Sequence, residues 1–302
     1  LLKKKLGIVD ELTKGIDFLF KKNKVTKYIG TAKILSPNEI EIMNNEKAEI
    51  INADKIIIAT GSESTNLPNI NVDEKKIVTS TGALELDKVP EKMIVIGAGI
   101  IGLEMGTVWR RLGAEVEVVE YLNRILPGID DEIAKNFMKI LQKQGIKFKL
   151  GHSVEKAKIE KDKVLLSIKD VNDNTLNELV ADVALVSVGR KPNTNGLGLD
   201  KLNLKIDKHG FIETNENFQT SISNIYAIGD VIRGPMLAHK AEEDGVAAVE
   251  IINGEAGHVD YNLVPGIIYT SPELAVIGKT EEELKSAGIS YNKGIFPLMA
   301  NS

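Results

Sequence analysis

Residues 93–106 of this 302-residue chain read MIVIGAGIIGLEMG, an apolar run that leads directly into Gly97, Gly99 and Gly102. Glycines with this G-x-G-x-x-G spacing also arise by chance, in turns and in helix packing, so the flanking sequence decides what they mean. Residues 93–96 are typical of a short buried strand. The pattern therefore places the glycines at a strand end, where a ligand can approach the backbone.

A helix and a second strand follow the glycines. We predict the helix from Ile100 to Leu112, with Gly113 as its stop, and its apolar stripe is formed by Ile101, Met105, Val108 and Leu112. The second strand, residues 115–120 with the sequence EVEVVE, ends in the acidic residue Glu120. Strand, glycine loop, helix, strand and acid occur in the order of a dinucleotide-binding unit.

Each part of this unit has a physical role in holding a dinucleotide. Gly97 makes the tight turn, Gly99 lets the pyrophosphate approach the backbone, and Gly102 lets helix and strand pack closely. The helix N-terminus offers N–H groups to the phosphates, and Glu120 would accept hydrogen bonds from the ribose hydroxyls. The alternative interpretation is a glycine turn that binds no ligand.

The composition excludes several classes of function. The chain is 43% hydrophobic and 27% charged, as in ordinary globular proteins, and its formal net charge of −5 argues against nucleic acid or an anionic membrane as partner. No apolar run approaches the ~18 residues of a membrane span, and no signal peptide is recognisable. There is no cysteine, and four scattered histidines show no ligand spacing, so we expect neither a disulfide nor a metal site in these residues.

Two regions of the chain resemble each other. FKKNKVTKYIG at 20–30 is similar to LQKQGIKFKLG at 141–151, and AKI follows each stretch. Each copy then continues through a polar, hairpin-like segment to a closing strand, ADKIIIATG at 53–61 and ADVALVSVG at 181–189. Four elements recurring in one order indicate two copies of one nucleotide-binding domain rather than coincidence.

The glycine loop belongs to the second copy. The first copy starts after the place where its own strand and glycine loop would lie. We therefore expect the 302 residues to be a fragment that lacks an N-terminal segment with a second dinucleotide loop.

Both closing strands end in a glycine, Gly61 and Gly189. A glycine at the carboxyl end of a strand permits close approach of a ligand in the crevice, although a plain turn would explain either one alone. A third short strand, residues 225–228, ends in Gly229 and Asp230. A carboxylate in this position can accept hydrogen bonds from a polyol chain.

The helix that we predict next, from about Ala238 to Ile252, would direct its N-terminal N–H groups and the positive end of its dipole to the same place. A reduced flavin carries negative charge on one ring edge and would suit such a helix end. A capping role for Asp230 is the plainer alternative.

Five stretches together resemble the flavin- and pyridine-nucleotide-dependent disulfide oxidoreductases. They are IIIATGS, VIGAGIIGLEMG, VSVGRKPNT, NIYAIGDVIRGPMLAHKAEEDG and YTSPELAVIGKTEEEL. The stretch ILPGIDDEIAKNFMKILQKQGIKFKL, together with Ile100 where glutathione reductases carry a tyrosine, is similar to the branch that oxidises dihydrolipoamide in 2-oxoacid dehydrogenase complexes.

The resemblance implies an α/β fold of two Rossmann-like domains followed by the start of an α+β interface domain. The FAD domain would comprise residues 1–88 and 214–262, with the NAD domain at 89–213 inserted between them and the interface domain beginning at 263–302. It further implies a homodimer in the full-length protein, a lipoyl-bearing protein as partner, and a location in the bacterial cytoplasm or the mitochondrial matrix.

The resemblance also implies two sets of cofactor-binding residues. The NAD set consists of Gly97, Ala98, Gly99, Ile100, Ile101, Gly102, Leu103, Glu104, Glu120, Val154 and Gly189. The FAD set consists of Ala32, Thr60, Gly61, Ser62, Asp230, Met236, Leu237, Ala238 and His239. Within the chain only Glu104 would act near the reaction, by positioning the nicotinamide, because the family's cysteine pair and its His-Glu base would lie outside these residues.

The resemblance leaves two rival functions open. One is a sibling enzyme, either another flavin disulfide reductase or a soluble transhydrogenase. The other, of a different class, is a module that binds NAD without turnover.

Overall fold

The computed structural model describes residues 1–297 and divides the chain into two compact units, each assembled from separate segments. The first unit contains residues 1–65, 84–88 and 189–261. Among the described residues, the second unit contains 66–83, 89–188 and 262–297. The chain therefore enters each unit more than once.

A five-stranded, all-parallel sheet forms the centre of the second unit, in the order β6-β13-β7-β8-β9. Its strands are β6 (Ile77–Val78), β7 (Lys92–Ile96), β8 (Glu115–Glu120), β9 (Lys147–Leu150) and β13 (Val183–Val186). All four residues of β13 and four of the five in β7 are buried, as expected for a parallel sheet covered on both faces. The next strand after β7 in the chain, β8, lies on one side of β7, and β13 lies on the other, so the order reverses at β7.

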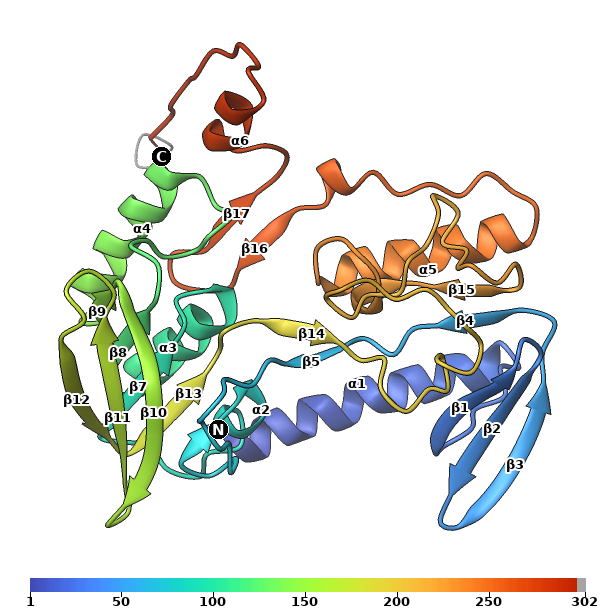
Figure 1. The fold of residues 1–302 in the computed structure, drawn as a ribbon, viewed down its shortest axis with the longest axis horizontal. Coiled ribbons are helices and arrows are strands. Elements are labelled where there is room, and N and C mark those ends of the chain that lie inside the picture. Colours follow the sequence, from blue (N-terminus) through green and yellow to red (C-terminus); the bar gives the residue numbers. More distant parts are fainter. Residues whose placement is uncertain (298–302) are drawn as a thin grey trace. The chain divides into compact units, whose positions relative to one another are not determined.

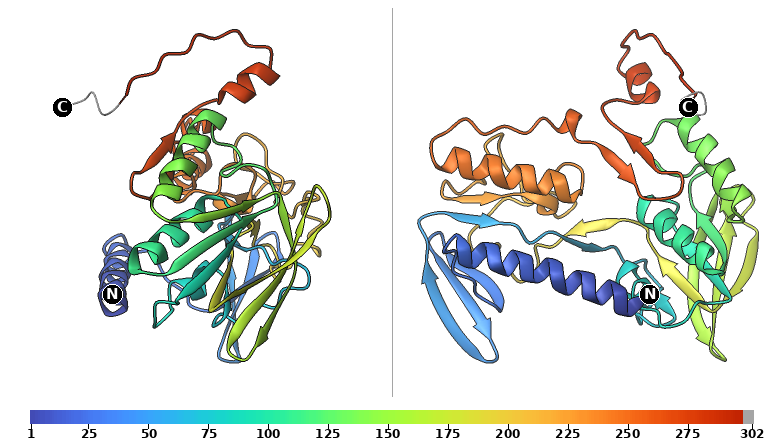
Figure 2. Two further views of the ribbon diagram at one scale, coloured as in Figure 1. Left: turned by 90° about the vertical axis from the view of Figure 1, so that its left-hand side faces the viewer. Right: turned by 180° about the vertical axis from the view of Figure 1, so that it is seen from behind.

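The two faces of this sheet have different covers. An antiparallel sheet of three strands, β10 (His152–Glu160), β11 (Lys163–Asp170) and β12 (Leu176–Ala181), packs through its apolar residues on Ile94, Ile96 and Val119. On the other face α3 (Ile100–Leu112) approaches Val95 and Val116 through Gly106. Figures 1 and 2 show α3 and the β10–β12 sheet on opposite sides of the parallel strands.

The bounds predicted for α3 are confirmed, but its predicted apolar stripe is wrong. Val108 and Leu112 are exposed, and the buried residues are instead Gly102, Leu103, Gly106, Thr107 and Trp109. Two glycines and a threonine on the sheet side let the helix axis come close to β7 and β8, and this close approach decides which side faces inward. Ile101 and Met105 of the predicted stripe are half-buried, so large apolar residues do not mark the side of α3 that packs on the sheet.

The first unit repeats this plan. Its antiparallel sheet of three strands consists of β1 (Thr31–Ser36), β2 (Glu39–Asn44) and β3 (Lys47–Asn52), and the parallel pair β4 (Ile56–Ile58) and β15 (Ile225–Ala227) follows. β5 (Ser62–Ser64) pairs with β14 (Arg190–Pro192). The 21-residue helix α1 (Leu2–Lys22) precedes the sheet and has no buried residue.

The core of the first unit lies around β4 and β15. Ile56, Ile58, Ile225 and Ala227 are buried together with Ala248 of α5 (Ala238–Ile252), and Figures 1 and 2 show α5 alongside β15. A short 3-10 helix, η1 (Gly229–Val231), connects β15 with the segment that leads to α5.

The last elements belong to the second unit, apart from the first residue of η2 (Tyr261–Leu263). They are β16 (Gly266–Ile268), β17 (Leu274–Val276) and α6 (Glu281–Ser286), and the second unit also contains α2 (Ser80–Ala83) and α4 (Asp131–Lys143). A capping box between Thr280 and Glu283 starts α6.

The internal repeat is confirmed as a structural one. Both units place a helix, a three-stranded antiparallel sheet and a parallel strand in the same order along the chain. This confirms the α/β fold class with two Rossmann-like domains. Among the described residues, no helix combines the length and apolar character required to cross a membrane.

Candidate nucleotide-binding sites

The glycine loop lies at the carboxyl end of β7, where the strand order of the parallel sheet reverses. Gly97 has a φ of +101°, and a Cβ there would lie 2.5 Å from the Ser187 carbonyl oxygen. A Cβ on Gly102 would lie 2.3 Å from the Gly97 carbonyl oxygen. Both positions therefore exclude a side chain, in agreement with the roles of turn and close packing predicted for them.

Gly99 differs from its two neighbours. Its φ is −78°, and an added Cβ would meet no atom within 4 Å. The backbone at Gly99 therefore faces open space and tolerates a side chain sterically. Gly99 is also the N-cap of α3, which has no side-chain cap, so the positive end of the helix dipole is directed to this space. An anion such as a pyrophosphate fits this combination.

Glu120, the last residue of β8, holds the loop from the neighbouring strand. Its Oε2 accepts a hydrogen bond from the Ala98 N–H at 2.7 Å, and its Oε1 accepts one from the Leu122 N–H at 2.8 Å. A carboxylate has about four acceptor positions, so each oxygen can still accept a bond from a ribose hydroxyl. The sequence predicted the ribose contact; the anchoring of the loop is visible only in the structure.

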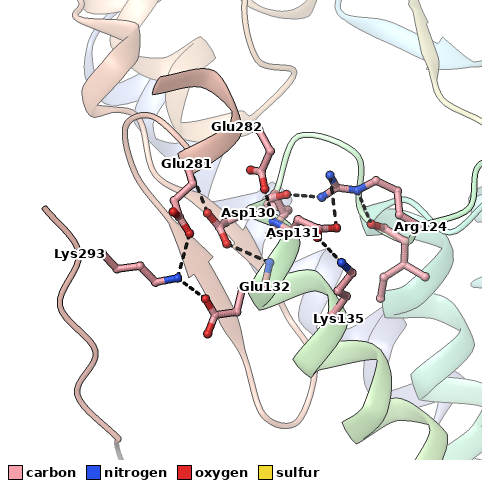
Figure 3. Close-up of polar contacts among 10 residues, drawn as sticks. Arg124, Asp130, Asp131, Glu132, Lys135, Glu281, Glu282 and Lys293 are labelled. Carbon is pink, nitrogen blue, oxygen red and sulfur yellow. Dashed lines mark hydrogen bonds and ion pairs between the residues drawn. The ribbon is translucent and has the colours of Figure 1, made fainter. Parts of the chain in front are cut away.

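Arg124, four residues beyond Glu120, binds groups of its own loop. Its guanidinium donates to the Ile129 carbonyl and lies 3.8 Å from Asp131 at the start of α4, as Figure 3 shows. Arg124 thus holds the segment between β8 and α4. Its own loop therefore supplies acceptors for this basic side chain.

Glu104 is half-buried on α3, and its Oε1 accepts a hydrogen bond of 2.8 Å from the backbone N–H of Tyr269. Tyr269 directly follows β16, so a segment far along the chain orients this carboxylate. The sequence did not indicate this contact, because every residue except proline has a backbone N–H and the residue type therefore does not reveal the donor. Glu104 is therefore held in place within the second unit.

The remaining residues of the NAD set have varied surroundings. Ile100 and Ile101 are half-buried in the first turn of α3, whereas the side chain of Leu103 is fully buried. Val154 on β10 packs on the cluster that contains Ile96 and Val119. Gly189 has a φ of +122° and belongs to the first unit, where its carbonyl accepts the Thr65 N–H at 3.0 Å.

The first unit brings the predicted FAD residues of two loops together. β4 and β15 run parallel and side by side, so the turn after β4 and the Gly229–Asp230 turn after β15 emerge at one edge. The hydroxyl of Ser62 donates to Asp230 Oδ2 at 2.6 Å, and Oδ1 takes no part in this bond. Thr60 donates to the Asn193 carbonyl at 2.6 Å, and the φ of Gly61 is +69°.

Arg190 is a residue of this site that was not predicted. Its Nε donates to the Ser62 hydroxyl at 2.7 Å, and its second nitrogen donates to the Ser62 carbonyl at 2.6 Å. The hydroxyl hydrogen of Ser62 is thereby directed to Asp230. The only signal in the sequence was the position of Arg190 directly after the strand-end glycine Gly189.

The start of α5 lacks a side-chain cap, and Leu237 is its N-cap. Met236, Leu237 and His239 are half-buried, while Ala238 is exposed, as is Ala32 on β1. The predicted helix bounds, Ala238 to Ile252, are confirmed. The open N-terminus gives this unit, too, a helix end whose dipole favours negative charge.

A third polar cluster joins the start of α4 to the chain around α6 (Figure 3). Asp130 caps α4 by accepting the Glu132 N–H and also accepts the Glu281 N–H at 3.2 Å, and Lys293 bridges Glu132 and Glu281. Hydrogen bonds from Tyr291, Lys293 and Lys285 lower the pKa of Glu281 to about 2. Every charge in the cluster has an internal partner, so we assign it a structural role. Among residues 1–297 no group of three or more His, Cys, Asp or Glu side chains could hold a metal ion.

Comparisons with known proteins agree with this geometry. Residues 2–245 match the family model described as pyridine nucleotide-disulphide oxidoreductase, and residues 264–302 match the model of its dimerisation domain. The chain is 54% identical over 295 residues to the mitochondrial dihydrolipoyl dehydrogenase of Pisum sativum, covering 97% of this chain and 59% of that protein. It is 53% identical to the leghemoglobin reductase of Glycine max, covering 97% of this chain and 56% of that protein.

A similar solved structure is a Cu(II) complex of a mutant of the HOCl-induced flavoprotein disulfide reductase RclA from Escherichia coli. It aligns with a TM-score of 0.87 and 25% identity, over 95% of this chain and 65% of that one. This chain spans less than two thirds of the length of each of these three proteins.

Proposed function

The chain belongs to the pyridine nucleotide-disulphide oxidoreductase family, and from this premise we propose that its parent protein is a dihydrolipoamide dehydrogenase that uses FAD and NAD⁺. The observation that carries the proposal is identity of 50–54% to dihydrolipoyl dehydrogenases from a plant, an amoeba, a nematode and a mammal, over nearly the whole of this chain. The reaction would oxidise the dithiol of a lipoyl group and reduce NAD⁺.

The second unit supports the proposed NAD site. The open backbone at Gly99, the uncapped start of α3 and the carboxylate of Glu120 fit a pyrophosphate followed by an adenosine ribose. We assign Glu104 to positioning the nicotinamide, since its carboxylate is oriented by the Tyr269 N–H. In this assignment Val154 of the same unit belongs to the site. Residues 89–213 are proposed as the NAD domain.

The first unit supports the proposed FAD site. Asp230, with Ser62 bound to one oxygen, would accept hydrogen bonds from the ribityl hydroxyls, and the uncapped start of α5 would favour negative charge on the flavin ring. The chemistry that FAD supplies when bound is acceptance of an electron pair and its transfer as hydride. We assign residues 1–88 and 214–262 to the FAD domain and residues 263–302 to the interface domain.

We further propose that the protein is a homodimer. Its partner would be a lipoyl-bearing protein of a 2-oxoacid dehydrogenase complex, and its compartment the mitochondrial matrix. The match of residues 264–302 to a dimerisation domain supports the dimer. Relatives named mitochondrial dihydrolipoyl dehydrogenase support the partner and the compartment.

The test is a substrate comparison with the protein expressed from its full reading frame. We expect NAD⁺ reduction by dihydrolipoamide at a kcat/KM at least a hundredfold above that for glutathione disulfide reduction by NADPH. A third assay measures leghemoglobin reduction, because two proteins similar to this chain are named leghemoglobin reductase. Faster turnover of glutathione disulfide, or hydride exchange between nucleotides without a dithiol, would assign the protein to a sibling enzyme.

A further inference from the structure

We propose that Lys240, Asp244 and Tyr261 are positioning residues that hold the Gly229–Asp230 turn in the shape in which Asp230 binds the flavin cofactor. The inference rests on the proposed function, which makes Asp230 a ligand of FAD. It adds three residues, none of which was predicted to contact the cofactor.

The first observation is an ion pair that is completely enclosed. Lys240 and Asp244 lie one turn apart on α5, their Nζ and Oδ2 atoms are 2.8 Å apart, and both side chains are 0% exposed. Removing two charges from water is unfavourable, and apolar residues of similar volume often stabilise a protein as well or better. Stability alone therefore gives no reason for an ion pair at this place.

The second observation is what this pair binds. Lys240 Nζ donates to the Gly229 carbonyl at 3.0 Å, and Asp244 Oδ2 accepts the Gly229 N–H at 2.9 Å. Both backbone polar groups of a single residue are thus bound by two side chains of opposite charge. Such a clamp fixes the orientation of the peptide units on each side of Gly229, and the second of these units leads to Asp230.

The third observation is the left-handed conformation of Gly229. Its φ is +70°, and a Cβ there would lie 3.1 Å from the Cβ of Ala241, so α5 packs directly on the turn. The left-handed conformation is accessible to glycine, but glycine is also the most flexible residue. External hydrogen bonds are needed to keep this residue in one conformation, and the ion pair supplies them.

Tyr261 completes the network from beyond the helix. Its hydroxyl donates to Asp244 Oδ1 at 2.9 Å, and Lys240 Nζ lies 4.9 Å from the centroid of its ring. Burial and then the bond to Asp244 raise the pKa of Tyr261, so the phenol stays protonated and remains a donor. The carboxylate of Asp244 therefore has three partners: a lysine, a backbone N–H and a phenol.

Asp230 is consequently held from two directions. Ser62 binds its side chain, and the network fixes the backbone that precedes it. Loss of the network should leave Asp230 in place but broaden the range of its orientations. The result should be weaker FAD binding, and loss of the Tyr261 hydroxyl alone should cause it without a matching loss of stability in the apoprotein.

The test uses full-length protein with FAD removed and then titrated back, with flavin fluorescence as the measure of the dissociation constant. Tyr261→Phe removes one hydroxyl and retains the ring, and we expect it to weaken FAD binding about tenfold. The double variant Lys240→Met with Asp244→Leu replaces the pair by apolar residues and should weaken FAD binding at least as much. The melting temperature of the apoprotein should stay close to the wild type in Tyr261→Phe; in the double variant it should fall, because the buried Gly229 N–H and carbonyl lose their partners.

Ala248→Gly is the matched control, because Ala248 is buried in the same helix but forms no hydrogen bond with the turn. It should lower the melting temperatures of apoprotein and holoprotein alike and change FAD affinity by less than about twofold. If the network variants behave like this control, their role is structural and the inference is overturned.

Asp230→Ala separates failure of this inference from failure of the proposed function. Unchanged FAD affinity in Asp230→Ala would remove the assigned role of Asp230 and with it the basis of the inference. If Asp230→Ala weakens FAD binding but Tyr261→Phe does not, only the positioning role is wrong. If the network acts through Asp230, Tyr261→Phe should have less than about a twofold effect in the Asp230→Ala background.

Discussion

Replacement of Glu120 by alanine should remove the discrimination between NAD⁺ and NADP⁺. Glu120 ends β8 and already accepts the Ala98 and Leu122 N–H groups, which fixes its carboxylate beside the glycine loop. In the wild type we expect NAD⁺ to bind about ten- to a hundredfold more tightly, because the carboxylate accepts from the ribose hydroxyl and repels a 2′-phosphate.

The magnitude is set by one hydrogen bond. A hydrogen bond to a charged acceptor stabilises by roughly 1.5–3 kcal/mol, and NAD⁺ alone forms it, which corresponds to about ten- to a hundredfold in the dissociation constant. Repulsion of the 2′-phosphate by the carboxylate acts in the same direction. Loss of the Ala98 anchor disturbs the loop for both nucleotides, so it cancels in the ratio of their dissociation constants.

The assay is calorimetric titration of both nucleotides into the wild type, Glu120→Ala and Arg124→Ala. In Glu120→Ala the ratio should fall to about one, mainly through weaker NAD⁺ binding. Arg124→Ala is the control from the following loop. Arg124 is bound to Ile129 and lies near Asp131, so its loss should leave the ratio unchanged.

Two results would refute this reasoning. NADP⁺ binding as tight as NAD⁺ binding in the wild type would mean that Glu120 does not face the ribose. A selective loss of NADP⁺ binding in Arg124→Ala would mean that Arg124 leaves its loop to bind the phosphate.

Three further predictions concern other parts of the chain. Gly102→Ala places a Cβ 2.3 Å from the Gly97 carbonyl oxygen and should lower the melting temperature by several degrees. The Cβ of Gly99→Ala meets no atom within 4 Å, so this variant should keep the wild-type melting temperature and bind NAD⁺ about tenfold more weakly. Equal effects of the two variants on stability would contradict the assigned roles. The 302-residue chain has no cysteine and should not reduce NAD⁺ with dihydrolipoamide in the presence of FAD; turnover at the rate of a complete dehydrogenase would disprove this. The pKa of Glu281 is lowered from 4.5 to about 2 on folding, so its stabilising contribution is complete above pH 4.5 and is lost as the pH falls towards 2. The melting temperatures of the wild type and of Glu281→Gln should therefore converge over this interval at low salt, and a constant difference would show that the carboxylate does not titrate there.

The local features of the second unit could be predicted from the sequence because they depend on neighbouring residues. The strand before the loop, the bounds of α3 and the acid at the end of β8 all follow from hydrophobic periodicity and glycine placement. The repeat was also visible, since each copy encodes the same order of elements. The inward side of α3 was mistaken because Gly102 and Gly106 have no apolar signal, although they permit the closest packing.

What the sequence determined by itself was the kind of site: a glycine loop after a strand, an acid at the end of the next strand, and a Gly-Asp pair before a second helix. Only the tertiary structure decided how these groups are held. The bond from Ser62 to Asp230 spans 168 residues, and the contact of Glu104 with the Tyr269 N–H spans 165. The first contact depends on the parallel strands β4 and β15, which bring their carboxyl ends together. The second uses a backbone N–H, which every residue type except proline supplies, so the residue type of Tyr269 does not reveal it. The enclosed pair of Lys240 and Asp244 reads in sequence as an ordinary helical charge pair, and only its burial behind Gly229 gives it a role.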